Sequence, residues 1–119
     1  MKVGVLGAGL MGKEAARDLA NSNDVTEIGI ADIDYEKAKK AAQGLQSDKI
    51  IPYQVDAAKE NELINYMKRF DVIINALFYT FNERAARAAI KTGVHSLDLG
   101  GQIEHITDTI LKLPEEAQK

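Results

Sequence analysis

Short apolar runs rich in branched side chains alternate along the chain with segments of helical periodicity. Alternation of this kind is typical of a parallel sheet whose faces are covered by helices. The pattern therefore predicts an α/β fold. The expected strands are Lys2–Leu6, Glu27–Ala31, Ile50–Val55, Asp71–Ala76 and His95–Leu99.

The segments between the runs carry single apolar stripes, as expected for helices packed on a sheet. Asp34 precedes the second helix as a plausible N-cap, and Gly93 follows a helix over Asn82–Thr92, where a left-handed residue is favoured. Another helix is expected from Ile103, and Pro114 should kink or restart it. Two of the stripes are Met11, Ala15 and Leu19, and Ala38, Ala41, Ala42 and Leu45.

A glycine-rich loop directly follows the first expected strand and opens the first helix. In the pattern G-x-G-x-x-G, the first glycine permits a tight turn and the second lets the backbone approach a pyrophosphate. The third lets the helix pack closely on the strand, and free N–H groups at the helix terminus attract phosphate. A tight turn that binds nothing is disfavoured by this context. We therefore predict a dinucleotide-binding loop formed by Gly7, Ala8, Gly9, Leu10, Met11 and Gly12.

The loop and the alternation together predict a Rossmann-type, doubly wound parallel sheet with strand order 3-2-1-4-5. Such sheets usually have a sixth strand, which is expected after Lys119. We therefore interpret residues 1–119 as one domain that is cut short before this strand.

Asp32 ends the second expected strand 20 residues after Gly12. An acid at this position accepts hydrogen bonds from the adenosine ribose and should repel a 2′-phosphate. No arginine follows it, so NAD is favoured over NADP. Ile33 is assigned to the cofactor site, and Asp34 to capping the next helix. The lysines of that helix, Lys37, Lys39 and Lys40 beside Glu36, are interpreted as its solvated face.

Polar residues also stand at the carboxyl ends of the later strands, where open α/β sheets bind ligands. We expect Asp56 and Ala57 to border the adenine. Each of these residues taken singly could be an ordinary residue of a strand-end loop. The residues expected along the nicotinamide riboside are Asn75, Ala76, Leu77 and Phe78.

Composition excludes several other functions. The formal net charge of −3 and the pI near 5.4 disfavour nucleic acid as a partner. No apolar run is long enough for a membrane span or a signal peptide, so we expect a cytoplasmic protein without a membrane partner. Cysteine is absent, which excludes disulfides and thiolate chemistry.

Two further constellations are rejected. His95 and His105 have no regular ligand spacing, so no metal site is expected. Ser96 and Asp98 beside His95 cannot form a catalytic triad, because neighbours in a strand point to alternate faces.

With these motifs in place, the sequence resembles the saccharopine dehydrogenase family. The specific segments are residues 7–19, GAGLMGKEAARDL, residues 75–82, NALFYTFN, and residues 93–101, GVHSLDLGG. Within the family, the sequence most resembles the lysine 6-dehydrogenases. The likeness covers nearly all of the chain but only about the N-terminal third of such an enzyme.

The resemblance implies oxidation of an amine carbon of lysine or saccharopine by hydride transfer to NAD(P). The lysine enzymes release ammonia as the semialdehyde closes to a cyclic imine. The resemblance also implies that a further domain, absent from these residues, is needed to bind the amino-acid substrate. That domain would hold the catalytic acid or base. No catalytic residue is therefore assigned, and Tyr79, Asn82 and Asp98 are only candidates for the near wall of the substrate pocket. Pro114 departs from the expected helix, and Gly4 and Gly29 should cost some packing within their strands.

Two alternatives remain open. The chain could be a stand-alone NAD-sensing regulatory module of the potassium-transport type, or a degenerate Rossmann domain used only for protein contacts. The intact loop disfavours the second alternative. A homo-oligomer is possible, and the identity of the oxidised amino acid stays open.

Overall fold

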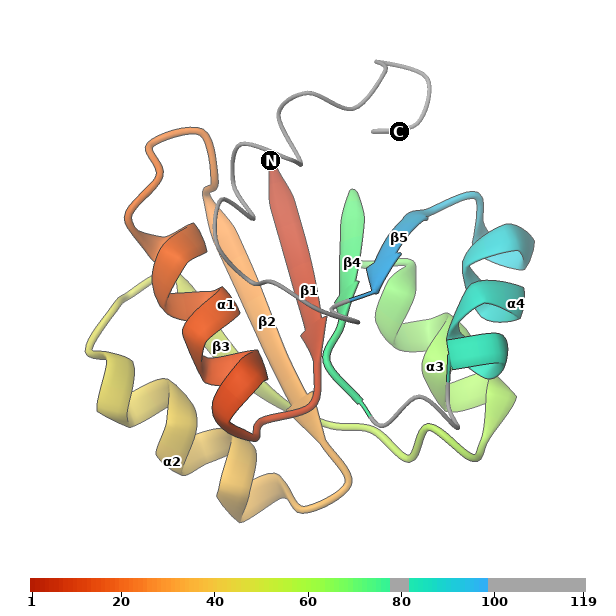
Figure 1. Ribbon diagram of the computed structural model, residues 1–119, viewed down its shortest axis with the longest axis horizontal. Helices are drawn as coiled ribbons and strands as arrows, with labels where there is room; N and C mark the ends of the chain where they lie inside the picture. The colour runs from red at the N-terminus through yellow and green to blue at the C-terminus, as the bar shows by residue number, and fades with distance from the viewer. Residues whose placement is uncertain (78–81, 99–119) are drawn as a thin grey trace.

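The strands of the protein form a single parallel sheet. A computed structural model describes residues 1–77 and 82–98. Its five strands follow the order β3-β2-β1-β4-β5, which confirms the predicted Rossmann-type fold (Figure 1). The strands are β1 (Lys2–Leu6), β2 (Glu27–Asp32), β3 (Ile50–Gln54), β4 (Val72–Asn75) and β5 (His95–Asp98).

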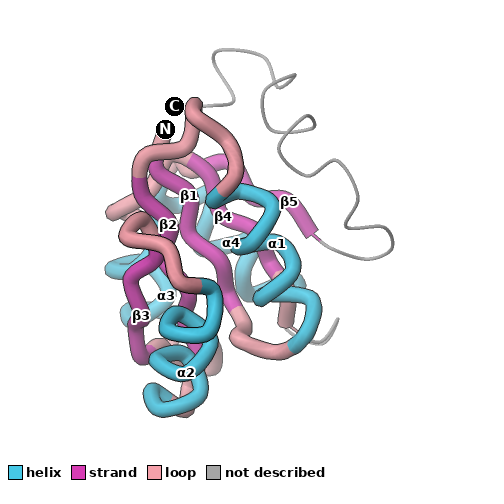
Figure 2. The backbone as a smooth tube through the Cα atoms, turned by 90° about the vertical axis from the view of Figure 1, so that its left-hand side faces the viewer, coloured by secondary structure: helices cyan, strands magenta, loops and turns pink. Residues whose placement is uncertain are grey.

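Helices cover both faces of the sheet, as Figure 2 shows in a view turned by 90°. Branched residues of β1, β2 and β4 pack against the alanines of α1 and α2 on one face. Leu63, Met67 and Ala88 form the centre of the core on the other face. The helices are α1 (Leu10–Ala20), α2 (Tyr35–Leu45), α3 (Glu60–Met67) and α4 (Asn82–Thr92).

The structure confirms the features predicted at two helix boundaries. Asp34 accepts hydrogen bonds from the N–H groups of Glu36 and Lys37, at 3.1 and 3.4 Å, and so caps α2 as predicted. Gly93 after α4 has φ +74°, the left-handed conformation that glycine adopts most readily. The helix expected from Ile103 lies outside the described residues.

Gly4 and Gly29 do not cost packing as expected from their positions inside strands; they make room for aromatic rings. A Cβ atom on Gly29 would lie 2.4 Å from Phe70 Cζ, and one on Gly4 would lie 2.6 Å from Phe70 Cδ2. The Tyr66 hydroxyl also reaches the sheet here and donates to the Val5 carbonyl at 2.9 Å. Burial raises the pKa of this hydroxyl, so it stays protonated. The prediction was wrong because strand propensity ignores what packs over the sheet.

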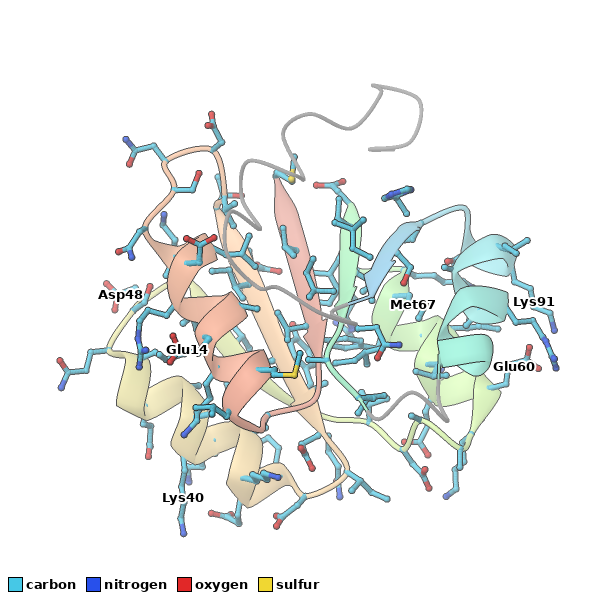
Figure 3. All side chains as sticks on the ribbon, viewed as in Figure 1. Glu14, Lys40, Asp48, Glu60, Met67 and Lys91 are labelled. Carbon is cyan, nitrogen blue, oxygen red and sulfur yellow. The ribbon has the colours of Figure 1, made fainter. Side chains whose placement is uncertain are left out.

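An ion pair joins the helices on the same face. Lys91 of α4 and Glu60 of α3 point toward one another (Figure 3), with Nζ 2.5 Å from Oε1. The hydrogen bond and charge of Lys91 lower the pKa of Glu60. Both side chains are exposed, so the pair contributes little to the stability of the fold.

Candidate functional site

The loop between β1 and α1 is held by close backbone contacts that require glycine. Gly7 has φ +101°, and its N–H donates to the Ala31 carbonyl of β2 at 2.7 Å. A Cβ atom on Gly12 would lie only 1.8 Å from the Gly7 carbonyl oxygen. Glycine at these two positions is thus needed to build the loop.

Gly9 differs, because nothing among residues 1–77 and 82–98 excludes a side chain there. It is the N-cap of α1 in an extended conformation, with φ −76° and ψ −168°, and no atom of the described residues would lie within 4 Å of a Cβ there. Within the described part of the chain, the space above the loop is therefore open to a ligand.

The start of α1 is suited to an anion. Gly9 provides no capping side chain, and the first turn of the helix carries no acidic residue. The N–H groups of Leu10, Met11 and Gly12 belong to the first turn and have no acceptor within the helix. Their partial positive charge favours a phosphate group at this end.

Asp32 brings a carboxylate next to the same loop. Its Oδ2 accepts a hydrogen bond from the Ala8 N–H at 3.0 Å, and its Oδ1 accepts one from the Asp34 N–H at 3.0 Å. Two backbone groups thus orient the carboxylate. Each oxygen keeps a further lone pair for a ligand hydroxyl.

Exposed apolar side chains border the loop. Leu10 is 73% exposed, Ile33 62% and Met11 38%. All three were predicted to contact the cofactor, and large exposed hydrophobic groups beside a polar loop are suited to covering an aromatic ring or a ribose. Their position is compatible with the predicted role, which stays a prediction.

Asp56 and Ala57 follow β3 as expected, but their contacts within the chain are structural. The Asp56 carboxylate accepts from the Ala58 N–H at 2.9 Å, and the Asp56 N–H donates to Glu62 at 3.0 Å. Ala57 is partly buried and packs against the core cluster that contains Leu63 and Met67. The bond to Glu62 was not predicted, because it joins the turn after β3 to the following helix.

Asn75 lies at the end of β4, where the strand order switches between β1 and β4. It is 2% exposed, and its Oδ1 accepts from the Leu77 N–H at 3.1 Å. Ala76 donates its N–H to the Leu6 carbonyl at 2.9 Å and so lies beside the end of β1. These three predicted residues therefore lie near the start of the glycine loop.

The remaining predicted residues are only partly described. Phe78 and Tyr79 lie outside the described residues. Asn82 begins α4, and Asp98 ends β5 in register with Asn75. The side chains of Asn82 and Asp98 also lie outside the described part.

A pocket of about 410 Å³ that the sequence did not predict lies beside the loop. It is lined by Ala8, Gly9 and Leu10, by Lys13 of α1, and by Lys37, Lys40 and Ala41 of α2. Lys37 and Lys40 are exposed, as their assignment to the solvated face of α2 predicts, and they also line this pocket. Their spacing of three residues puts them on one helix face, and this spacing is the signal that was available. The sequence could not show that Lys13 of another helix lies against the same face.

Other kinds of site find no support in the described part of the chain. Residues 1–77 and 82–98 contain no cluster of His, Asp or Glu side chains able to hold a metal ion. Within those residues, no helix has the length and apolarity to cross a membrane.

Comparisons with known proteins agree with this geometry. The family model described as saccharopine dehydrogenase NADP binding domain matches residues 3–119. A putative precorrin-2 dehydrogenase of Methanocaldococcus jannaschii is 27% identical over 88 residues, which cover 74% of this chain and 42% of the relative.

Two solved structures share the fold. Apo saccharopine dehydrogenase (L-Glu forming) from Saccharomyces cerevisiae aligns with a TM-score of 0.73 at 22% identity, covering 90% of this chain and 23% of that one. Quinate dehydrogenase from Corynebacterium glutamicum in complex with NAD aligns with a TM-score of 0.54 at 20% identity, covering 64% and 26%. The chain thus spans less than half of each of these three proteins.

Proposed function

Since the chain belongs to the family of saccharopine dehydrogenase NADP-binding domains, we propose that it is the cofactor-binding part of an NAD-dependent amino-acid dehydrogenase. The reaction is hydride transfer from an amine carbon of lysine or saccharopine to NAD. The observation that carries the proposal is the Asp32 carboxylate, which lies one hydrogen bond from the Ala8 N–H of the open glycine loop.

The glycine loop fits a dinucleotide, because no described atom occupies the space that a Cβ on Gly9 would take. In the proposed complex, the first turn of α1 holds the pyrophosphate and Asp32 accepts from the adenosine ribose. Ile33, Asp56 and Ala57 border the adenine. The bound cofactor would supply the hydride acceptor, and the residues along its nicotinamide riboside are Asn75, Ala76, Leu77 and Phe78.

The substrate side of the site is assigned to another part of the enzyme. The chain covers 23% of the yeast saccharopine dehydrogenase, and none of the described side chains is proposed as the general base. We propose that the far wall of the substrate pocket and this base belong to a substrate domain. Tyr79, Asn82 and Asp98 remain candidates for the near wall.

We predict that the isolated chain binds NADH about tenfold more tightly than NADPH, a difference of roughly 1.4 kcal/mol. The Asp32 carboxylate accepts a ribose hydroxyl but repels a 2′-phosphate. Calorimetric titration measures both affinities, and Asp32→Ala should reduce the difference between the affinities for NADH and NADPH. Asp48→Ala removes an equal charge from the turn between α2 and β3 (Figure 3) and should leave this difference in affinity unchanged. Equal or tighter binding of NADPH by the native chain would contradict the assigned preference.

We also predict that these 119 residues do not oxidise lysine or saccharopine. Holding a substrate carbon against the nicotinamide contributes roughly 7–11 kcal/mol to lowering such a barrier, and a positioned base must take the proton. The assay follows NADH absorbance at alkaline pH with excess substrate, in a sample whose NAD binding has been confirmed by titration. Turnover that disappears in Tyr79→Phe or Asp98→Asn would place the catalytic groups on this chain instead.

A further inference from the structure

The outer edge of the sheet, at β3, exposes apolar side chains that the proposed cofactor does not use. In the part of the chain that the structure describes, six large hydrophobic side chains are exposed, and three of them border the glycine loop. Two of the other three flank β3. Tyr35, which begins α2, is 40% exposed, and Ile51 of β3 is 38% exposed. Neighbouring exposed apolar groups mark a surface for contact with another molecule.

A groove runs between α2 and β3, which lie side by side at this edge (Figure 2). Its volume is about 550 Å³, and its lining combines apolar side chains with one cation and one anion. We call it the β3 groove. The lining residues that matter here are Tyr35, Ala42, Ile50, Pro52, Lys39 and Asp48.

The main chain of β3 is poorly suited to pairing with a further strand. The N–H of Val55 donates to the Asp32 carbonyl of β2 at 3.0 Å, and bonding to one neighbour alternates along a strand. Residues 50, 52 and 54 therefore direct their main-chain groups outward. The Ile50 N–H already bonds to the Ser47 carbonyl at 3.3 Å, and Pro52 has no N–H. Side chains, not a ladder of main-chain bonds, must hold a partner at this edge.

The two charges of the groove are free to meet a partner. Lys39 and Asp48 form no ion pair within residues 1–77 and 82–98. The C-terminal half of α2 separates them, because Asp48 lies in the turn beyond the end of this helix (Figure 3). That turn is fixed in place by Lys49, whose Nζ donates to the carbonyls of Ala20 and Ser22 at 3.2 and 2.8 Å. The groove thus carries opposite charges at its two ends.

We propose that two copies of this chain associate through the β3 groove about a two-fold axis, with Lys39 of each copy paired to Asp48 of the other. In such an interface the same patch meets itself. A two-fold axis across the groove reverses its direction, so the cationic end of one copy faces the anionic end of the other. A partner carrying one sign of charge would instead meet a like charge at one end. Tyr35 and Ile51 would be covered in the same step.

The dimer should be weak, because the groove is smaller than the 20–30 residues a side that are typical of a standard interface. We expect a dissociation constant on the order of 10–100 µM. Sedimentation equilibrium of the full chain measures it, over concentrations from about a tenth of this constant to ten times it. The average mass should rise from that of a monomer toward that of a dimer.

Substitutions that reverse one charge test the pairing. Lys39→Asp and Asp48→Lys should each remain monomeric over the same range, because each change brings like charges together twice in every dimer. Lys40→Asp is the matched control: it makes the same change at the next residue, which lines the pocket beside the glycine loop. This variant should dimerise like the native chain. Circular dichroism establishes that each variant is folded.

A mixture of the two monomeric variants tests the two-fold arrangement itself. The groove of Lys39→Asp carries two anions and the groove of Asp48→Lys carries two cations, so both contacts between unlike copies are attractive. An equimolar mixture should therefore form a dimer with about the native dissociation constant. A chain with both changes should also dimerise with itself, because its charges are exchanged and not lost.

Three results would overturn this inference. The native chain could stay monomeric throughout, the dimer could persist in both single variants, or the two folded variants could fail to associate when mixed. The last two results would place the contact on another face. Titration of the native chain with NADH is independent of all three, because the groove does not include the glycine loop. A chain that dimerises as expected but does not bind NADH would contradict the proposed function alone.

Discussion

Replacing Gly9 with valine is expected to weaken NADH binding by about a hundredfold or more without unfolding the protein. The backbone of Gly9 is extended, a conformation that valine adopts readily, and no atom of the part of the chain that the structure describes lies within 4 Å of its Cβ position. The added side chain would instead fill the space proposed for the pyrophosphate. Losing two hydrogen bonds to a charged group, each worth about 1.5–3 kcal/mol, accounts for an effect of this size.

Titration with NADH measures the affinity, and circular dichroism measures the fold. Gly44→Val is the matched control, because Gly44 of α2 also has no described atom within 4 Å of its Cβ position but lies outside the loop. It should bind NADH like the native chain. Normal binding by Gly9→Val, or loss of its native fold, would show that the loop has another role.

Replacing Gly12 with alanine is expected to destabilise the fold itself. The substitution should lower the free energy of unfolding by about 3 kcal/mol or more. The new Cβ would lie 1.8 Å from the Gly7 carbonyl oxygen and 3.6 Å from Val5 Cγ1. The close neighbour is backbone, and Gly7 is itself bonded to Ala31 of β2. Relief of the clash must therefore move α1 away from the sheet. A loss of this size is a large share of the 5–15 kcal/mol that is typical of a domain.

Urea denaturation followed by circular dichroism gives the free energy of unfolding. Gly44→Ala should be neutral or stabilise the chain by about 0.5–1 kcal/mol, because alanine favours a helix more than glycine does. If Gly12→Ala unfolds at the same urea concentration as the native chain, the close approach of α1 to Gly7 is not required. The two loop substitutions together separate a glycine needed for the ligand from one needed for the fold.

Local sequence signals were sufficient for most of the fold. Branched apolar runs alternating with amphipathic segments predicted the parallel sheet, because both faces of such strands are buried. The glycine pattern predicted the turn into α1, and Asp34 predicted the cap of α2, because these features depend on neighbours only a few residues away. Asp32 was also correctly placed beside the loop.

The sequence could not predict contacts between elements that are distant along the chain. Gly4 and Gly29 looked like weak strand residues until Phe70 was found to pack over them. The hydrogen bond from the Tyr66 hydroxyl to the Val5 carbonyl was not predicted either, because 61 positions along the chain separate the two residues. Each of these outcomes depends on which side chains or backbone groups fill the space around a residue.

By itself, the sequence determined the α/β fold, the turn that opens the site and the acid beside it, because each depends on residue type and short spacing along the chain. Only the tertiary structure decided that Lys13 of α1 shares a pocket with Lys37 and Lys40 of α2. The physical reason is that a binding surface depends on distances between side chains of different elements. Packing of the two helices on the sheet sets those distances, and the spacing of residues along the chain does not encode them.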